Sequence, residues 1–310
     1  MSKPRTTARA LRVFAEARAA DGAMLPIYSA GGPRGAPALL AGHANGLAAG
    51  AYAPWFTMLA RRFRVFAFDA RGHGRSRWPD GPLDEVFSVD RFAEDLAAVA
   101  ARLAARLGGA AIAFAGHSLT AAAALRLAAR SGSLPFARSV LFEPPIFPPR
   151  EHANYAEAAA QQERLIAGSA RRRAHWPSPN AFRDFIHGRG VFKNFAPGYL
   201  EAHCRATLKR DPAGGYVLRC PPAVESAVFR SHRDADTWQR LPLISLPLDL
   251  VSGDPDLAGR DWVSGAMAAI AARLPRAKLA VLRGAGHLMI QEQPAACCDL
   301  IFKLLAPPEG

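Results

Sequence analysis

The feature that most constrains the fold is a five-residue turn between an apolar segment and a helix-forming segment. The segment at 110–115 reads AAIAFA, the turn at 116–120 reads GHSLT, and the stretch at 121–130 reads AAAALRLAAR. A Ser flanked two positions away by small residues, between a strand and a helix, predicts a sharp turn that strains its own backbone. That turn places Ser118 at a helix N-terminus, where backbone N–H groups favour negative charge. The alternative interpretation is an ordinary strand, turn and helix in which Ser118 is only a cap.

Length and composition predict a globular protein. The 310 residues suit one large α/β domain with an insertion, or two domains of ordinary size. Half of the residues are apolar, but no apolar run reaches the ~18–20 residues of a membrane-spanning helix. The first nine residues, MSKPRTTAR, lack the apolar core of a secretory signal. We therefore expect residues 1–9 to be a flexible tail, a cytoplasmic location and no membrane insertion.

The formal net charge of +13 raises the question of a nucleic-acid partner. The positive charge is nearly all arginine and is spread along the chain, with Arg171 to Arg173 as its one run. Dispersed charge without a recognisable binding module does not predict a phosphate-binding face. We expect no nucleic-acid partner.

The cysteines predict reduced thiols rather than a metal centre. Cys204, Cys220, Cys297 and Cys298 show no CxxC spacing and no accompanying histidine cluster. An adjacent pair such as Cys297 and Cys298 makes a poor disulfide and a poor zinc site. No metal ion or cofactor is predicted.

Short apolar strands alternate with helices along most of the chain. This pattern predicts a mostly parallel sheet of about eight strands with helices on both faces, preceded by a hairpin at 11–29. The alternation stops from about 148 to 241, where Ser178-Pro179 and Pro221-Pro222 are helix start signals instead. We therefore predict an α/β core from residues 10–146 and 242–310, with a helical cap at 147–241.

A nucleophilic Ser needs a base to accept its proton. His287 lies in GAGH at 284–287, directly after the last predicted strand at 279–282. This places it at the carboxyl edge of the sheet, the same edge as Ser118. The alternative for any one histidine is a structural or solvated side chain, but the position after the strand favours His287 as the base.

Three carboxylates could orient that base. Asp254 and Asp256 follow the strand at 248–252, and Glu143 ends the strand at 139–142. Gly-Asp-Pro-Asp is also good turn chemistry, so the aspartates have a structural alternative. The order Ser, acid, His holds for each of the three, and the residues alone leave the choice open.

Oxyanion donors are expected from two loops. The N–H of Leu119 follows the Ser, and Asn45 lies in the loop at 43–46, where the chain turns back toward Ser118. The alternative for this second loop is a simple Gly-rich connection between strand and helix.

Five motifs in order resemble the α/β-hydrolase fold over nearly the whole chain: HANG at 43–46, DARGHGRS at 69–76, GHSLT at 116–120, SGDPD at 252–256 and GAGH at 284–287. The resemblance implies that Asp256, three residues after a Gly, is the acid, with Glu143 and Asp254 as alternatives. It also implies that His73 is structural. FEPP at 142–145 and LRCPPAVESA at 218–227 resemble a group of capped microbial hydrolases.

The resemblance implies a serine hydrolase that cleaves a carboxylic ester, lactone or thioester through an acyl-enzyme. A Ser nucleophile disfavours epoxide hydrolysis and dehalogenation, because members with those activities use Asp. Carbon–carbon bond hydrolysis and cofactor-free peracid formation use the same triad, and some relatives are non-catalytic binding proteins. The aromatic residues of the cap suggest a small-molecule substrate with an apolar part, although we expect most of them to form the cap's own core: Trp176, Phe182, Phe185, Phe192, Phe195 and Tyr199. No oligomeric state is predicted.

Overall fold

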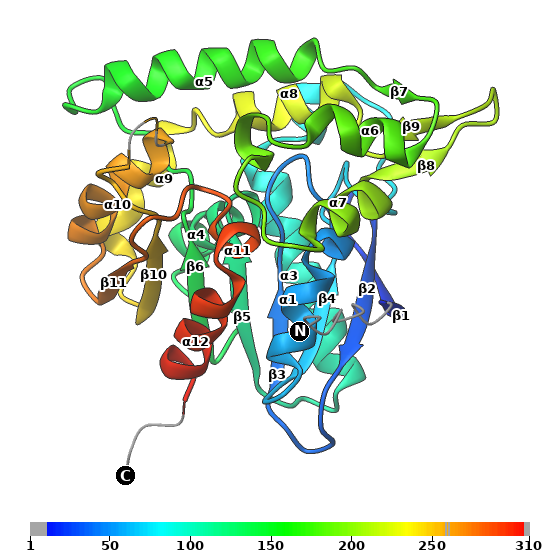
Figure 1. Ribbon diagram of the computed structural model, residues 1–310. Coiled ribbons are helices and arrows are strands. Elements are labelled where there is room, and N and C mark those ends of the chain that lie inside the picture. Colours follow the sequence, from blue (N-terminus) through cyan, green and yellow to red (C-terminus); the bar gives the residue numbers. More distant parts are fainter. Residues whose placement is uncertain (1–10, 258, 260, 307–310) are drawn as a thin grey trace, which may run out of the picture.

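An eight-stranded sheet forms the centre of the protein (Figure 1). The computed structural model describes residues 11–257, 259 and 261–306, so the tail predicted at 1–9 lies outside the described residues. The strands follow the order β1-β2-β4-β3-β5-β6-β10-β11. Their bounds are β1 Arg12–Arg18, β2 Met24–Gly31, β3 Ala38–Ala41, β4 Arg64–Phe68, β5 Ile112–His117, β6 Arg138–Phe142, β10 Leu248–Ser252 and β11 Ala277–Val281.

The sheet topology decides which loops meet. β1 and β2 form the predicted antiparallel hairpin, β2 pairs antiparallel with β4, and the remaining strands are parallel. β5 lies between β3 and β6, and β6 lies between β5 and β10. Because parallel strands end at one edge, the loops after these strands converge there. The turn at Ser118 is therefore flanked by the loops that carry Asn45 and Glu143.

Helices cover both faces of the sheet, as the alternation predicted. α3, α4 and α10 enclose one apolar core, and α1 and α12 enclose the other. The helical bounds are η1 Ala49–Tyr52, α1 Ala53–Leu59, α2 Leu83–Val86, α3 Val89–Arg106, α4 Leu119–Ser131, α10 Trp262–Arg273, α11 Met289–Glu292 and α12 Pro294–Leu304. Pro54 lies in the first turn of α1, and Ser88 occupies the N-cap of α3 without a side-chain capping bond. The predicted fold class is confirmed.

The segment between β6 and β10 is not purely helical. Its helices are α5 Tyr155–Ala170, α6 Pro179–Ile186, η2 Gly190–Phe192, α7 Tyr199–Thr207, α8 Pro222–Ser231, α9 Ala235–Arg240 and η3 Leu241–Leu243. A small antiparallel sheet accompanies them, formed by β7 His175–Trp176, β8 Leu208–Arg210 and β9 Tyr216–Leu218. These strands are two or three residues long, which is too short for a periodic apolar pattern to predict them. In Figure 1, α5 and α8 run across the carboxyl edge of the main sheet.

The aromatic side chains of this segment divide between several environments. Trp176 and Phe182 lie in a small apolar cluster of the segment itself, with Phe192 and Phe195 packed against it. Tyr199 is buried in the main core, and Phe185 is 49% exposed. Most of the rings are therefore structural, as expected.

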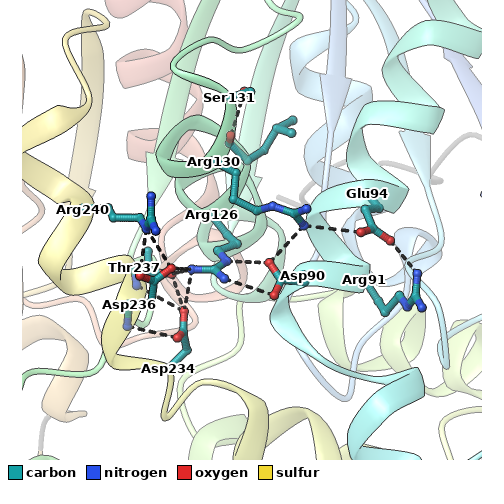
Figure 2. A network of polar contacts seen from close by, with 11 residues as sticks. Asp90, Arg91, Glu94, Arg126, Arg130, Ser131, Asp234, Asp236, Thr237 and Arg240 are labelled. Atoms are coloured by element: carbon teal, nitrogen blue, oxygen red, sulfur yellow. Dashed lines mark hydrogen bonds and ion pairs between the residues drawn. The ribbon is translucent and has the colours of Figure 1, made fainter.

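A polar network fastens the end of this segment to the helix that follows Ser118 (Figure 2). Arg126 of α4 forms ion pairs with Asp90 of α3, at 2.7 Å, and with Asp234 at the N-cap of α9, at 3.2 Å. Its guanidinium also contacts Asp236. The network holds α9 against α4, the helix that begins directly after Ser118.

No helix in the described part of the chain is long and apolar enough to cross a membrane. The four cysteines are free thiols, as predicted, and all four are buried.

Candidate active site

Ser118 occupies a strained turn between β5 and α4. Its backbone has φ 51° and ψ −111°, a region that side-chain-bearing residues rarely adopt. The turn is held because the N–H of Ser118 donates to the carbonyl of Phe142 at 2.8 Å. A non-glycine residue persists in such a conformation where the surrounding structure dictates it, and such sites concentrate at functional positions. A helix cap needs no positive φ, so the capping interpretation does not account for this turn.

Close contacts explain why small residues are needed around Ser118. A Cβ at Gly116 would lie 2.6 Å from the Phe114 ring and 3.0 Å from the Cα of Ala121. Thr120 is tolerated because Gly42 faces it: a Cβ at Gly42 would lie 2.5 Å from the Thr120 hydroxyl. The larger residue at 120 is thus matched by the absent side chain of Gly42, directly after strand β3.

His287 and Ser118 meet at the carboxyl edge of the sheet. The Nε2 of His287 lies 2.9 Å from the Oγ of Ser118, although 169 residues separate them. His287 lies in the loop between β11 and α11, where the sequence predicted it. The predicted pairing of these two side chains in space is present in the structure.

Glu143 is the carboxylate that contacts His287. Its Oε2 lies 2.6 Å from the Nδ1 of His287. Its Oε1 accepts from the N–H of Gly253 at 2.6 Å and from the hydroxyl of Ser264 at 2.6 Å. The residue is fully buried, so both carboxylate oxygens need partners, and both have them. With an ionised Glu143, the Nδ1–H of His287 donates to it and Nε2 is free to accept the Ser118 proton.

The structure does not bring Asp256 or Asp254 to His287. Asp256, the acid favoured by the resemblance, is 79% exposed and pairs with Arg283 at 2.6 Å. Asp254 accepts from the N–H of Gly284 at 2.9 Å and also contacts Arg283. Both aspartates thus hold the start of the loop that carries His287, which is the turn-forming alternative for Gly-Asp-Pro-Asp. The preference for Asp256 does not agree with this geometry.

The charge balance around His287 favours the protonated imidazole. Burial alone would lower the pKa of His287, but the hydrogen bond to Glu143 and the nearby charges of Asp261, Glu143 and Glu292 raise it to about 9. Glu292 accepts from the N–H of Gly286 at 2.7 Å, and Asp261 caps α10. Three carboxylates therefore surround one imidazole.

The expected oxyanion donors lie on either side of Ser118. Leu119 is the first residue of α4, so its N–H has no intrahelical acceptor. Asn45, in the loop after β3, lines the same cavity as Ser118. His73 holds this loop in place, because its Nε2 accepts from the N–H of Gly46 at 3.1 Å. Burial lowers the pKa of His73 to about 3, so this neutral imidazole acts as a structural acceptor.

A cavity of about 730 Å³ opens above Ser118, between the sheet edge and the segment that contains α5 and α8. Its wall mixes apolar and polar groups. The apolar contacts come from residues such as Leu47, Pro145, Phe192, Phe229 and Trp262, and the charged groups are Arg164, Arg172, Glu225, Asp261 and Glu292. Of the six aromatic residues named above between β6 and β10, Phe192 is the one that lines this cavity.

A family model, described as "Alpha/beta hydrolase family", matches residues 12–300. The chain belongs to this family. No curated protein matches the sequence significantly.

Solved structures with similar folds include several hydrolases. The structure of an E-2-(acetamidomethylene)succinate hydrolase matches with a TM-score of 0.73 at 22% identity, covering 94% of this chain and 99% of that one. A thermophilic esterase from Thermogutta terrifontis matches with a TM-score of 0.62 at 23% identity, covering 94% and 97%. An enol-lactonase from Burkholderia xenovorans matches with a TM-score of 0.64 at 21% identity, covering 94% and 99%. At these identities the likeness shows the fold alone. Membership of this family makes the protein a hydrolase with a small-molecule substrate.

Sequence reasoning missed a buried hydrogen-bonded chain that joins the two sides of this hydrolase site. The N–H of Ala44 donates to the hydroxyl of Tyr52 at 3.0 Å, and that hydroxyl lies 2.6 Å from the Nδ1 of His117. The Nε2 of His117 lies 2.8 Å from the backbone carbonyl of His287. His117 stands in the GHSLT motif, whose spacing of small residues points to its Ser alone. Tyr52 carries no local signal, because the contact spans 65 residues.

The end groups of this chain fix the direction of every proton in it. A backbone N–H only donates and a backbone carbonyl only accepts, so Nε2 of His117 carries the proton and its Nδ1 accepts from Tyr52. This needs a neutral imidazole, and burial with the nearby His287 lowers the pKa of His117 to about 3. The backbone N–H of Ala44, directly before Asn45, and the backbone carbonyl of His287 are thus joined by one continuous series of hydrogen bonds.

Replacing Tyr52 by Phe removes the central hydroxyl of this chain. We expect a fall in kcat of about tenfold with little change in KM. The backbones of Ala44 and His287 would no longer be linked by hydrogen bonds, so their relative position would be less well defined, while the cavity keeps its shape. Binding of a boronic acid, which mimics the tetrahedral intermediate, should weaken in parallel. Steady-state kinetics and inhibition constants measure both effects.

Tyr28→Phe is the matched control. The Tyr28 hydroxyl is also buried and donates to Asp69 at 2.6 Å, outside the cavity wall. Both variants should lose similar stability, about 1–2 kcal/mol in thermal or denaturant unfolding. Equal losses of kcat in the two variants would mean that Tyr52 supports the fold and not the site.

Proposed function

We propose that the protein is a serine hydrolase that cleaves an ester-like bond, a carboxylic ester, lactone or thioester, through an acyl-enzyme. The observation that carries the proposal is the unbroken contact from Ser118 through His287 to Glu143, at 2.9 Å and 2.6 Å, with Ser118 and His287 lining a cavity. A hydroxyl, an imidazole and a carboxylate in this order are the groups that acyl transfer needs.

In the proposed reaction, Ser118 attacks the substrate carbonyl and His287 accepts its proton. The N–H groups of Leu119 and Asn45 stabilise the tetrahedral oxyanion, each donor being worth about 3–4 kcal/mol in comparable sites. His287 then gives the proton to the leaving group, and a water molecule activated by the same imidazole hydrolyses the acyl-enzyme. Glu143 holds the Nδ1–H of His287 throughout and stabilises the imidazolium.

The assignment of the acid to Glu143 replaces the preference for Asp256. Glu143 is buried against the imidazole with its second oxygen satisfied by Gly253 and Ser264, whereas Asp256 reaches into solvent. A buried partner is the better orienting group, because water does not compete for its hydrogen bond. Asp254 and Asp256 keep a structural role at the start of the His287 loop.

An ester-like bond is the proposed bond class. Among the similar structures, an esterase, an enol-lactonase and a thioesterase domain act on acyl–oxygen or acyl–sulfur bonds by name, whereas a deformylase does not. A cavity wall with apolar residues on several sides suits a substrate with an apolar part. A binding protein without activity would have no need of the strained Ser118, since that strain costs stability without aiding ligand retention.

Three single substitutions test the triad on short-chain aryl esters. Ser118→Ala should abolish turnover, and Glu143→Gln should lower kcat by up to about 10⁴-fold, because the imidazole loses its tautomer and its counter-charge. Asp256→Asn should lower kcat by no more than about threefold, since its charge is exposed and screened. Retained activity in Ser118→Ala, or a larger loss in Asp256→Asn than in Glu143→Gln, would contradict the assignments.

The pH dependence of kcat/KM tests the electrostatics of His287. Only the neutral imidazole accepts the Ser118 proton, so activity should rise with pH through the pKa of about 9. Glu292→Gln should move the midpoint to lower pH, because it removes one carboxylate that raises this pKa while keeping an acceptor for Gly286. A midpoint near the ordinary histidine value in both proteins would contradict the charge arrangement.

The same raised pKa has a consequence for stability. Because the folded-state value of about 9 lies above the unfolded value of 6.5, protonated His287 stabilises the fold fully below pH 6.5. That contribution is lost as the pH rises through about 9.

A further inference from the structure

A second histidine lines the cavity beside Ser118 and His287. His232 follows α8 directly, lines the cavity and keeps only 5% of its surface exposed. Its Nδ1 is enclosed and has no hydrogen-bond partner among the described residues. Its Nε2 also has no partner in the described chain, but this atom is not enclosed. Because protein covers most of the side chain, Nε2 is the polar atom that His232 presents to the cavity.

The imidazole of His232 is neutral at pH 7. Burial and the nearby charge of His287 lower the pKa of His232 to about 4. A neutral imidazole carries a proton on one ring nitrogen and a lone pair on the other. The large majority of buried polar side chains have a hydrogen-bond partner, and a buried group without one lowers stability. A ligand that forms a hydrogen bond with Nε2 supplies the partner that the protein does not.

His232 lies at the leaving-group end of the cavity. The backbone carbonyl of Glu225, in the first turn of α8, accepts from the side-chain amide of Asn45 at 3.0 Å, so this end of the helix lies against the proposed oxyanion loop. His232 comes seven residues later, about 10 Å farther along the helix axis. There its ring is close enough to His287 for their charges to interact. His287 protonates the leaving group in the proposed reaction, so the alcohol part of an ester lies near His232.

A hydroxyl group matches the chemistry of this end of the cavity. Asp261 and Glu292 line the cavity and both raise the pKa of His287, so their negative charges oppose an anionic alcohol part. A hydroxyl is neutral and both donates and accepts, so it pairs with Nε2 of His232 whichever ring nitrogen carries the proton. A purely apolar alcohol part would leave Nε2 without a partner.

We propose that the substrates are esters whose alcohol part carries a hydroxyl group, and that Nε2 of His232 forms a hydrogen bond with this hydroxyl. The proposal rests on the serine hydrolase function proposed above and names its substrate class. His232 is then a binding residue for the leaving group and takes no part in the proton transfers of Ser118 and His287.

Pairs of butanoate esters of equal size test this selection. Ethylene glycol monobutanoate is compared with propyl butanoate, and trimethylene glycol monobutanoate with butyl butanoate, so that a hydroxyl replaces the terminal methyl group in each pair. The selectivity is the ratio of kcat/KM for the hydroxylated ester to kcat/KM for the alkyl ester. Differences in intrinsic reactivity between the two esters cancel when this ratio is compared between protein variants.

Variants connect the selectivity to His232. In His232→Phe the ratio should fall by about fivefold for at least one pair, the scale of one neutral hydrogen bond. His232→Leu repeats the test should the larger ring not fit. His232→Gln should keep most of the ratio, because its amide offers a donor and an acceptor at a similar reach.

His203→Phe is the matched control. His203 is also a buried histidine of the segment between β6 and β10, and both of its ring nitrogens are enclosed without a partner among the described residues. It does not line the cavity, so its substitution should leave the ratio at the wild-type value.

A hydroxyl on the acyl part tests which end of the ester His232 binds. Ethyl β-hydroxybutanoate is compared with ethyl isovalerate, in which a methyl group replaces the hydroxyl. This second ratio should be the same in the wild-type protein and in His232→Phe.

The outcomes separate this proposal from the function beneath it. An unchanged ratio for both butanoate pairs in His232→Phe overturns the proposal and leaves the serine hydrolase standing. An equal fall in His203→Phe also overturns it, because loss of a buried histidine would then act through the fold. A fall confined to the acyl pair overturns it too. Failure to hydrolyse any of these esters, together with no fluorophosphonate labelling of Ser118, overturns both.

Discussion

The buried carboxylate of Glu143 joins the loops on which the site depends. One oxygen holds His287, and the other accepts from Gly253 after β10 and from Ser264 on α10. Glu143 itself follows β6, so a single side chain fixes three loops against one another. Gly253 is needed for this approach, since a Cβ there would lie 2.8 Å from the carbonyl of Ala285 and 3.0 Å from Oε1 of Glu143. The position of the imidazole relative to Ser118 follows from these contacts.

Backbone strain and hydrogen bonding support each other at this edge. Ser118 and Glu143 are the two non-glycine residues with positive φ in the described chain, at 51° and 41°. Each costs about 1–3 kcal/mol. Both are held by bonds to the neighbouring strand, from Ser118 N–H to Phe142 and from Glu143 N–H to Val251. These backbone conformations turn both side chains toward the loop that carries His287. The hydrogen bonds through Tyr52 and His117 then connect that loop to Ala44, the residue before Asn45.

Much of the fold and part of the site could be predicted from the sequence, for identifiable reasons. Apolar runs that stop at polar or glycine residues mark where the strands end. Because parallel strands end at one edge of the sheet, these positions place Ser118, His287 and the three candidate acids at that edge. The choice between acids could not be made, because it depends on the positive φ of Glu143 and on Arg283 drawing Asp256 into solvent. Neither effect has a local signature, and the same holds for the strands of two or three residues beside α6 and α7.

The proposed function requires Ser118 to be a nucleophile that is activated by His287. Incubation of the wild-type protein with a fluorophosphonate probe, followed by mass-spectrometric identification of the labelled residue, measures this reactivity. We expect stoichiometric labelling at Ser118 and none in Ser118→Ala. Absence of labelling, or a label at another residue that persists in Ser118→Ala, would contradict it.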